Sequence, residues 1–380
     1  MKKLLILLII LPMLMQAQQT INSSIEHDGL TRDYILYIPE NYDGTQAVPL
    51  ILNFHGYGSN AFEQMNYGDF RPIADTAGFL VVQAQGELLN GISHWNVGGW
   101  TIGSTVDDVG FTSALIDSLS ALYNIDTDRV YATGMSNGGF MSFLLACQLG
   151  DKIAAVAPVA GSMTPETYDE CSPIHSMPIL QFHGTTDNVV PYDGAIWTRP
   201  VQDAIDYWVD YNNCYPLPTT IQIPDTDPND GSTVEHIIYP TGDNGVSTEH
   251  FKIYGGGHTW PGSAFGGSGT NYDINASAEI WKFFLKYDIN GSVLPTSINN
   301  EDAASGLIVF PNPAKNTITV DGTIEDSDIS IISVEGKLVY KTKTYKKSPT
   351  TINIVDFNKG IYIIKVKGEN NSFTRKFIKK

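Results

Sequence analysis

Cysteine is scarce in this sequence. Only three occur among 380 residues, at positions 147, 171 and 214, too few for a disulfide-stapled scaffold or a cysteine-based zinc site. An odd number leaves at least one thiol unpaired. Cys147 lies in an apolar helical segment, where cysteine usually serves as a small buried hydrophobe. Cys171 and Cys214 are therefore the pair we would expect to form a disulfide.

Long apolar runs are missing after the N-terminus. No later segment approaches the roughly 18 consecutive apolar residues that indicate a membrane-spanning helix. Residues 4–15 are almost all apolar, follow two lysines and precede a small residue at position 17. This is the pattern of a secretory signal peptide. We predict a signal peptide over residues 1–17 and an exported protein without a stable membrane anchor.

Basic residues are scarce in the first 304 positions. This part holds 10 Lys and Arg against 34 Asp and Glu, a net charge of −24, whereas residues 305–380 hold 13 against 7, a net charge of +6. An acidic body repels phosphate groups, so we expect no nucleic-acid partner. The charge is compatible with neutral or apolar ester substrates.

Residues 18–288 alternate between short apolar runs and helical stretches. Most of the runs are apolar throughout, as expected for strands that are covered on both faces. Between them, stripes at helical spacing such as Phe111, Leu115, Leu119 and Leu122 predict amphipathic helices. The alternation predicts an α/β fold, a mostly parallel sheet with helices on both faces. The expected strands are 34–38, 49–54, 79–82, 129–133, 154–159, 178–182 and 251–254.

The last quarter of the chain has a different pattern. Residues 289–304 are small and polar without a period, which predicts a linker. From residue 305 to 380, short β-like runs recur about every ten residues between turn residues, which predicts a small β-sandwich. The runs are 308–310, 317–320, 329–332, 338–340, 351–354 and 361–366.

A serine between two glycines is the strongest functional signal. Ser136 has Gly134 two residues before it and Gly138 two residues after it, between a strand-like and a helix-like segment. This arrangement is typical of the nucleophile elbow of an α/β-hydrolase. In a chain with 35 glycines the pattern can arise by chance, so the assignment depends on finding an acid and a base downstream.

The required order after the serine is acid and then histidine. Asp187 follows the strand expected at 178–182, and His258 lies in a glycine-rich loop after the strand expected at 251–254. Asp193 is the alternative acid, but Asp187 is nearer the strand end. His183 precedes a glycine in the acid loop and is expected to support that loop.

Oxyanion donors and pocket walls complete the expected site. The backbone N–H of Asn137 should be one donor, and that of Tyr57, in a glycine-rich loop after the strand at 49–54, the other. Trp95, Trp100 and Trp260 are candidates for substrate-binding walls, although a tryptophan is more often part of a core than of a pocket.

A metal site is not expected. Residues 225–231 resemble the start of a calcium loop, but Asp230 stands where a glycine is required and His236 where a glutamate is required. An acidic surface turn is the better interpretation.

Five separated motifs together resemble the polyhydroxybutyrate depolymerase and feruloyl esterase family of α/β-hydrolases. The resemblance covers residues 23–287 and implies a serine esterase with Ser136, Asp187 and His258 as its triad and with no cofactor. A serine peptidase on the same fold and an inactive surface-binding module are the alternatives. The motifs are residues 55–56, 106–111, 129–139, 183–187 and 257–262.

The C-terminal 75 or so residues resemble the sorting domain of the type IX secretion system of Bacteroidetes. Residues 311–314, 360–362 and 376–380 carry the likeness. It implies the secretion machinery as a partner and a route through the periplasm to the cell surface or the medium. No segment resembles a polymer-adsorbing domain. A feruloyl or acetyl ester of the plant cell wall is therefore favoured as substrate over a poly(3-hydroxyalkanoate).

Overall fold

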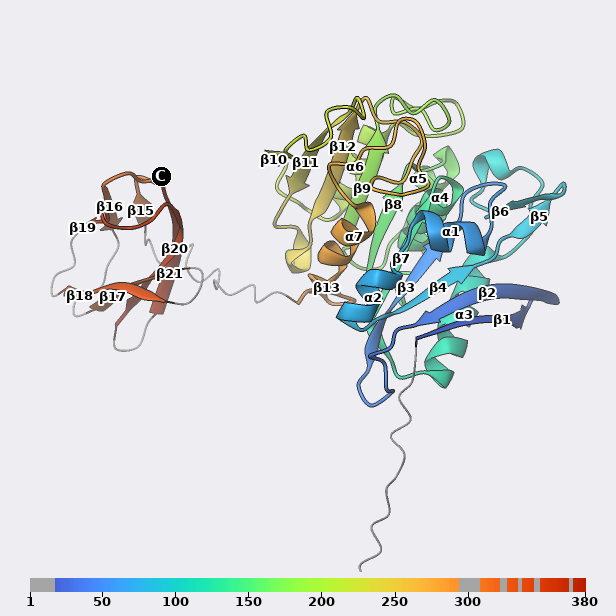
Figure 1. The fold of residues 1–380 in the computed structure, drawn as a ribbon, viewed down its shortest axis with the longest axis horizontal. Coiled ribbons are helices and arrows are strands. Elements are labelled where there is room, and N and C mark those ends of the chain that lie inside the picture. The colour runs from blue at the N-terminus through green and yellow to red at the C-terminus, as the bar shows by residue number, and fades with distance from the viewer. Residues whose placement is uncertain (1–17, 294–307, 322–326, 334–336, 345–348, 369–371) are drawn as a thin grey trace, which may run out of the picture. The chain divides into compact units, whose positions relative to one another are not determined.

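The computed structural model describes residues 18–293, 308–321, 327–333, 337–344, 349–368 and 372–380 (Figure 1). The chain divides into two compact units, Met1–Leu294 and Pro295–Lys380. The predicted signal peptide and residues 294–304 of the predicted linker lie outside the described residues. No helix in the described part of the chain is long and apolar enough to cross a membrane.

The first unit is built on a ten-stranded sheet. Its six central strands, from β4 to β12, run parallel, and antiparallel pairs extend both edges. In sheet order the strands are β1 (Gln19–His27), β2 (Leu30–Ile38), β4 (Leu80–Ala84), β3 (Val48–Phe54), β7 (Ile125–Met135), β8 (Ala155–Val159), β9 (Ile179–Gly184), β12 (Thr248–Tyr254), β11 (Thr233–Tyr239) and β10 (Thr219–Gln222). A separate hairpin pairs β5 (Glu87–Leu89) with β6 (Ile92–His94).

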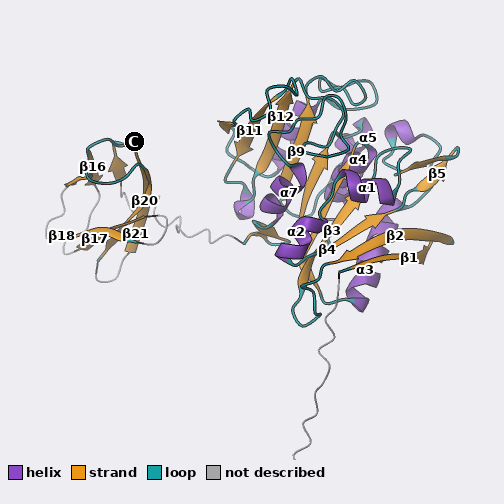
Figure 2. Ribbon diagram, viewed as in Figure 1, coloured by secondary structure: helices purple, strands orange, loops and turns teal. Residues whose placement is uncertain are grey.

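Helices cover both faces of this sheet (Figure 2). Successive residues of β3 explain why both faces are apolar, since Leu50 and Leu52 belong to one core and Ile51 to the other. On the first face lie α3 (Asp108–Leu122), α4 (Asn137–Gln148) and α6 (Val201–Tyr211); on the second lie α2 (Arg71–Ala77) and α7 (Ala276–Phe284). Shorter α1 (Ala61–Tyr67) contacts β2, β3 and β4, and α5 (Pro165–Glu170) contacts α4. The predicted α/β fold is confirmed.

Two boundaries differ from the sequence prediction. Leu122, placed on the apolar stripe of α3, is 70% exposed because it is the last residue of the helix. Residues 289–293, placed in the linker, belong to the folded unit. There β13 (Tyr287–Asp288) pairs with β14 (Gly291–Ser292), and the N–H of Ile289 donates to the carbonyl of Asp128.

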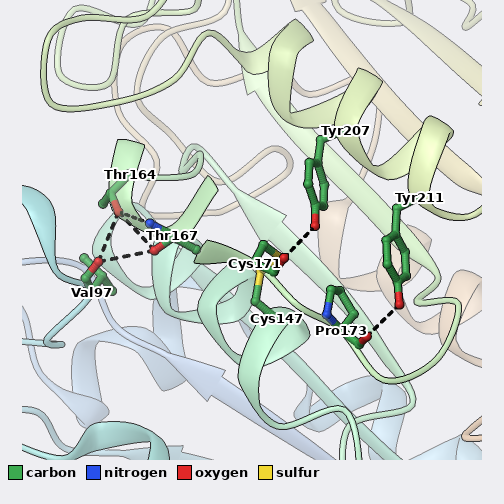
Figure 3. The surroundings of a disulfide bond; sticks show 8 residues. All are labelled: Val97, Cys147, Thr164, Thr167, Cys171, Pro173, Tyr207 and Tyr211. Carbon is green, nitrogen blue, oxygen red and sulfur yellow. Dashed lines mark hydrogen bonds between the residues drawn. A yellow bond between two sulfur atoms is a disulfide. The ribbon is translucent and has the colours of Figure 1, made fainter. Parts of the chain in front are cut away.

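The disulfide joins Cys147 to Cys171, so the predicted pairing of Cys171 with Cys214 is wrong (Figure 3). Cys147 lies in the last turn of α4 and Cys171 directly follows α5, with their Cα atoms 4.9 Å apart. This separation is within the usual range for a disulfide. Cys214 is a buried free thiol.

Helix α5 is held on more than one side. The hydroxyls of Thr164 and Thr167 donate to the carbonyl of Val97, and the hydroxyl of Tyr207 in α6 donates to the carbonyl of Cys171 (Figure 3). The short helix therefore connects α4, α6 and the loop that begins at Val97.

The second unit consists of two antiparallel sheets. One contains β15 (Ile308–Phe310), β16 (Thr317–Asp321) and β19 (Thr350–Asn353); the other contains β18 (Leu338–Thr344), β17 (Ser327–Ser333), β20 (Gly360–Lys367) and β21 (Ser372–Lys379). Both sheets contribute to a single core, with Val320 and Ile352 from the first and Ile329 and Ile364 from the second. Alternating burial along β20 places one face in this core.

Candidate active site

Ser136 occupies a sharp turn between β7 and α4. Its backbone has φ 56° and ψ −117°, a left-handed conformation that costs free energy for a residue other than glycine. The N–H of Ser136 donates to the carbonyl of Val159 at 2.8 Å, which ties the turn to the end of β8. Such strain persists only where the surroundings enforce it, and such positions cluster at functional sites.

The two flanking glycines are required by close backbone contacts. A Cβ atom on Gly134 would lie 2.6 Å from the carbonyl oxygen of Phe54, and one on Gly138 would overlap that same oxygen. Phe54 is the last residue of β3, and a central strand cannot move away. The spacing that identified the elbow in the sequence is therefore imposed by the neighbouring strand.

Asp187 and His258 meet beside this turn. Nδ1 of His258 lies 2.7 Å from Oδ2 of Asp187. The other carboxylate oxygen, Oδ1, accepts hydrogen bonds from the N–H groups of Val189 and Val190, both at 2.8 Å. Asp193, the alternative acid, is exposed. The contact with His258 is thus made by Asp187.

His183 contacts two residues of the loop that carries Asp187. Its Nδ1 accepts from the Gln181 amide at 3.2 Å, and its Nε2 donates to the carbonyl of Val190 at 2.9 Å and lies 3.4 Å from Oδ2 of Asp187. Burial alone would raise the pKa of the Asp187 carboxyl, but hydrogen bonds from His183 and His258 outweigh burial and hold that pKa well below its usual value. Asp187 is therefore ionised and able to orient His258.

Ser136 and His258 line the same cavity, which has a volume of about 650 Å³. Gly56 lines it as well, and a Cβ atom on Gly56 would lie 3.4 Å from Cβ of Ser136. The loop that carries Tyr57 thus passes directly beside the serine. Helix α4 begins at Asn137, directly after Ser136 in the chain, and a helix N-terminus favours negative charge that develops beside it.

The loop beside the serine is braced by buried polar contacts. Nε2 of His55 accepts from the N–H of Gly86 at 2.9 Å, so its Nδ1 donates to the carbonyl of Gly56 at 2.7 Å. Burial lowers the pKa of His55 to about 4, which keeps the ring neutral. The indole N–H of Trp95 donates to the carbonyl of His55 at 2.9 Å.

Trp95 and Trp260 are not where the sequence prediction placed them. Both are essentially buried, at 0% and 1% exposure, and neither lines a cavity at Ser136. The side-chain amide of Asn137 pairs with both backbone polar groups of Trp95, while the indole of Trp260 donates to Ser277 and packs against Phe70. Both indoles therefore belong to the core, where their N–H groups are hydrogen-bonded.

Trp100, the third candidate, does line a cavity. A second space of about 390 Å³ adjoins Ser136 and Tyr57, and its other lining residues are Trp100, Phe140, Val189, Val190 and Trp197. Sequence reasoning missed Trp197 and Phe140. Phe140 carried a signal, since it lies one helical turn after the serine, whereas Trp197 lies in a loop and carried none.

Asp107 and Asp108, which precede the elbow, have structural roles. Asp107 caps α3 by accepting from the N–H of Gly110. Asp108 forms a buried ion pair with Arg32 at 2.6 Å and accepts from the N–H of Asn96. Among the described residues, no group of three or more His, Cys, Asp or Glu side chains could hold a metal ion.

Two family models match separate parts of this chain. Residues 32–205 match the family described as Esterase PHB depolymerase, and residues 308–380 match the Secretion system C-terminal sorting domain. The part of the chain that contains the first match is called the esterase domain below, after the family model that it matches, and the second match follows it along the chain. Both resemblances predicted from the motifs are confirmed.

Curated relatives align with the esterase domain. The bifunctional acetylxylan esterase/xylanase XynS20E of Neocallimastix patriciarum is 30% identical over 277 residues, which cover 72% of this chain and 36% of the relative. Feruloyl esterase B of Piromyces equi is 32% identical over 238 residues, covering 60% of this chain and 42% of the relative. The chain thus spans less than half the length of these two relatives.

A solved structure with the same fold is the acetyl xylan esterase from Aspergillus awamori. It superposes with a TM-score of 0.51 at 13% identity and covers 71% of this chain and 99% of its own. At this identity the similarity shows the fold, which is that of a known esterase.

Proposed function

We propose that this protein is a secreted carboxylic ester hydrolase that acts through an acyl-enzyme on Ser136. The observation that carries the proposal is the 2.7 Å hydrogen bond between His258 and a buried, ionised Asp187, with His258 and the strained Ser136 lining one cavity. A serine nucleophile needs a base within reach and a group that orients the base. The names of the curated relatives and the family match support ester hydrolysis.

The proposed reaction has two halves. Because Nδ1 of His258 donates to Asp187, Nε2 is the nitrogen left to take the proton from Ser136 Oγ as it attacks the ester carbonyl. The N–H groups of Tyr57 and Asn137 are proposed to stabilise the oxyanion. The alcohol leaves with the proton from Nε2, and a water activated by the same nitrogen then hydrolyses the acyl-enzyme.

Cell-wall esters are the favoured substrates. The two relatives described above are named as an acetylxylan esterase and a feruloyl esterase, which supports acetyl or feruloyl esters over a poly(3-hydroxyalkanoate). The sorting-domain match supports export through the secretion machinery to the cell surface or the medium. A direct panel of methyl ferulate, acetylated xylan and poly(3-hydroxybutyrate) would rank these substrates.

The decisive test is removal of the nucleophile. Ser136→Ala should lower kcat for p-nitrophenyl acetate by about 10⁴-fold or more, and a fluorophosphonate probe should label wild type at Ser136 alone. Ser120→Ala, in α3 and away from both cavities, is the matched control and should leave the rate unchanged. Retained turnover in Ser136→Ala, or labelling of another residue, would overturn the proposal.

A further inference from the structure

Two backbone N–H groups beside Ser136 make no hydrogen bond. Within the described residues, neither the N–H of Tyr57 nor that of Asn137 has an acceptor. Asn137 is 0% exposed and directly follows Ser136, and Gly56, which precedes Tyr57, packs against the serine. A buried N–H without an acceptor costs free energy, so such a group calls for an explanation. What these two donors can bind depends on how the chain holds them.

We propose that His55, Trp95 and the side chain of Asn137 are positioning residues, which hold the N–H groups of Tyr57 and Asn137 in the geometry of an oxyanion hole. The inference rests on the function proposed above. It goes beyond that function by naming side chains that line neither cavity at Ser136 and that act through the two donors.

The ring of His55 sets the direction of the Tyr57 N–H. Its Nε2 accepts from the N–H of Gly86, so Nδ1 carries the proton and donates to the carbonyl of Gly56 at 2.7 Å. The N–H of Ser59 donates to the same carbonyl at 3.1 Å and closes a turn. This carbonyl and the Tyr57 N–H belong to one peptide unit, and in a trans peptide they point in opposite directions. Holding the carbonyl toward the buried ring therefore turns the Tyr57 N–H away from that ring.

Trp95 joins this loop to the start of α4. Its indole N–H donates to the carbonyl of His55 at 2.9 Å, and the two rings have centroids 5.0 Å apart. Its backbone N–H donates to Oδ1 of Asn137 at 2.7 Å, and its carbonyl accepts from Nδ2 of Asn137 at 3.1 Å. Trp95, His55 and Asn137 are all 0% exposed, so water does not compete for these hydrogen bonds. Trp95 thus fixes the two segments that carry the donors relative to each other.

Trp208 shows what a tryptophan does when it serves packing alone. It lies in α6, is also 0% exposed and lines neither cavity. Its indole nitrogen has no hydrogen-bond partner within the described residues. Replacement of either ring by phenylalanine removes similar packing, but only at Trp95 does it also remove a hydrogen bond to the loop beside Ser136.

The first test therefore compares Trp95→Phe with Trp208→Phe on p-nitrophenyl acetate. We expect Trp95→Phe to lower kcat by about tenfold or more and to change KM by less than about threefold. Acylation and deacylation both pass through an oxyanion, so both steps slow together and KM is little affected. Trp208→Phe should change kcat by less than about twofold.

The second test separates the two hydrogen bonds of the His55 ring. Asparagine places an amide nitrogen near the position of Nδ1, whereas glutamine places an amide oxygen near that of Nε2. His55→Asn can therefore keep the bond to the Gly56 carbonyl, and His55→Gln can keep the bond from the Gly86 N–H. We expect His55→Asn to retain about tenfold more kcat/KM than His55→Gln. A purely structural role predicts instead that the two variants rank by their free energies of unfolding in urea.

A trifluoromethyl ketone tests the oxyanion hole directly. Ser136 Oγ adds to the ketone carbon, the serine proton passes to Nε2 of His258, and the ketone oxygen becomes an oxyanion. The inhibition constant should rise in Trp95→Phe and in His55→Gln by the factor by which kcat/KM falls. In Trp208→Phe it should stay at the wild-type value.

The outcomes separate this inference from the proposed function. If Trp95→Phe keeps the wild-type inhibition constant, or if folded His55→Gln is as active as His55→Asn, the positioning role is wrong while Ser136-dependent hydrolysis stands. The His55 pair decides the question even where Trp95→Phe does not fold. If Ser136→Ala retains turnover, the function and the inference are both overturned.

Discussion

The esterase domain and the C-terminal unit differ most in what they bury. The first buries charged and polar side chains such as Arg32, Asp108, His183 and Asp187. In the described part of the second, the buried polar side chains are Ser327 and Thr344, and the core is aliphatic and aromatic. Burying a polar group costs free energy unless it is hydrogen-bonded. A fold therefore concentrates such groups where a site must be held in one geometry.

The strands show the same difference. In the esterase domain the central strands β4, β8 and β9 are buried along their whole length, whereas β20 of the C-terminal unit alternates buried and exposed positions. Parallel strands that are covered on both faces bring their carboxyl ends, and the loops that follow, to one edge of the sheet. Ser136, Asp187 and His258 all follow such ends. The variants below probe this contrast.

Removing one buried charge should have the largest effect. Asp187→Asn is expected to lower kcat by about 10⁴-fold, because an amide there stabilises the wrong tautomer of His258. Steady-state kinetics on p-nitrophenyl acetate measure the loss. The control is Asp193→Asn, at the exposed alternative acid, which should change kcat by less than about twofold. A reversed pattern would assign the acid to Asp193.

The disulfide comes next. Replacing Cys147 and Cys171 together by serine should lower the free energy of unfolding by about 3.5 kcal/mol, from the loop closed by their sequence separation of 24. Urea unfolding, followed at the transition of the esterase domain, measures this loss of stability. Wild type in reductant should match the double variant. Cys214→Ala, at the free thiol, should cost less. Insensitivity of wild type to reductant would contradict the bridge.

Acid should destabilise the esterase domain through Glu249. Burial would raise the pKa of this carboxyl, but the hydrogen bond from His236 and the charge of Lys286 lower it from 4.5 to about 2. The unfolded chain therefore binds the proton first as pH falls, so stability present above pH 4.5 is lost as pH falls through the folded value, by about 3 kcal/mol. Urea unfolding between pH 6 and pH 2 should show this loss.

Two glutamine variants test whether Glu249 causes this pH dependence of stability. Glu249→Gln should lower stability at pH 6 and flatten its pH dependence below pH 4.5. Glu40→Gln, at an exposed carboxyl, should leave the curve unchanged. A wild-type curve that stays flat between pH 4.5 and pH 2 would show that Glu249 is not held ionised by its partners.

Deleting the C-terminal unit should have the smallest effect on catalysis. A chain ending at Leu294 keeps both cavities and the hairpin of β13 and β14, so kcat/KM should change by less than about twofold. Assays of the purified truncated protein check this. In the native host the same truncation should block release. Loss of activity in the purified form would show that the two units are functionally coupled.

The parts that could be predicted from the sequence have local or topological causes. The elbow around Ser136 could be predicted because a backbone contact with Phe54 forbids side chains at Gly134 and Gly138. The expected positions of Asp187 and His258 followed from chain order and strand ends. In the structure these two side chains make the expected contact.

The parts that could not be predicted depend on tertiary packing. Cys147 pairs with Cys171 because α5 packs on the end of α4. No pattern in the sequence indicates this packing. Trp95 and Trp100 lie five residues apart in one loop region, yet one is buried under Asn137 and the other lines a cavity. Which indole lines the cavity depends on how that loop packs against α4 and α5.

The disulfide beside α5 bears on the stage of export at which the fold is completed. Disulfides form in oxidising compartments and are rare in the cytosol. The bridge connects α4, which carries Phe140, to the end of α5. Thr164, which caps the start of α5, and Thr167 within it donate to the carbonyl of Val97, which precedes Trp100. With export as proposed, the nascent chain leaves the cytosol with this brace still open. The packing of α5 on α4, which carries one wall of the cavity lined by Phe140 and Trp100, is then fixed by the disulfide only after translocation.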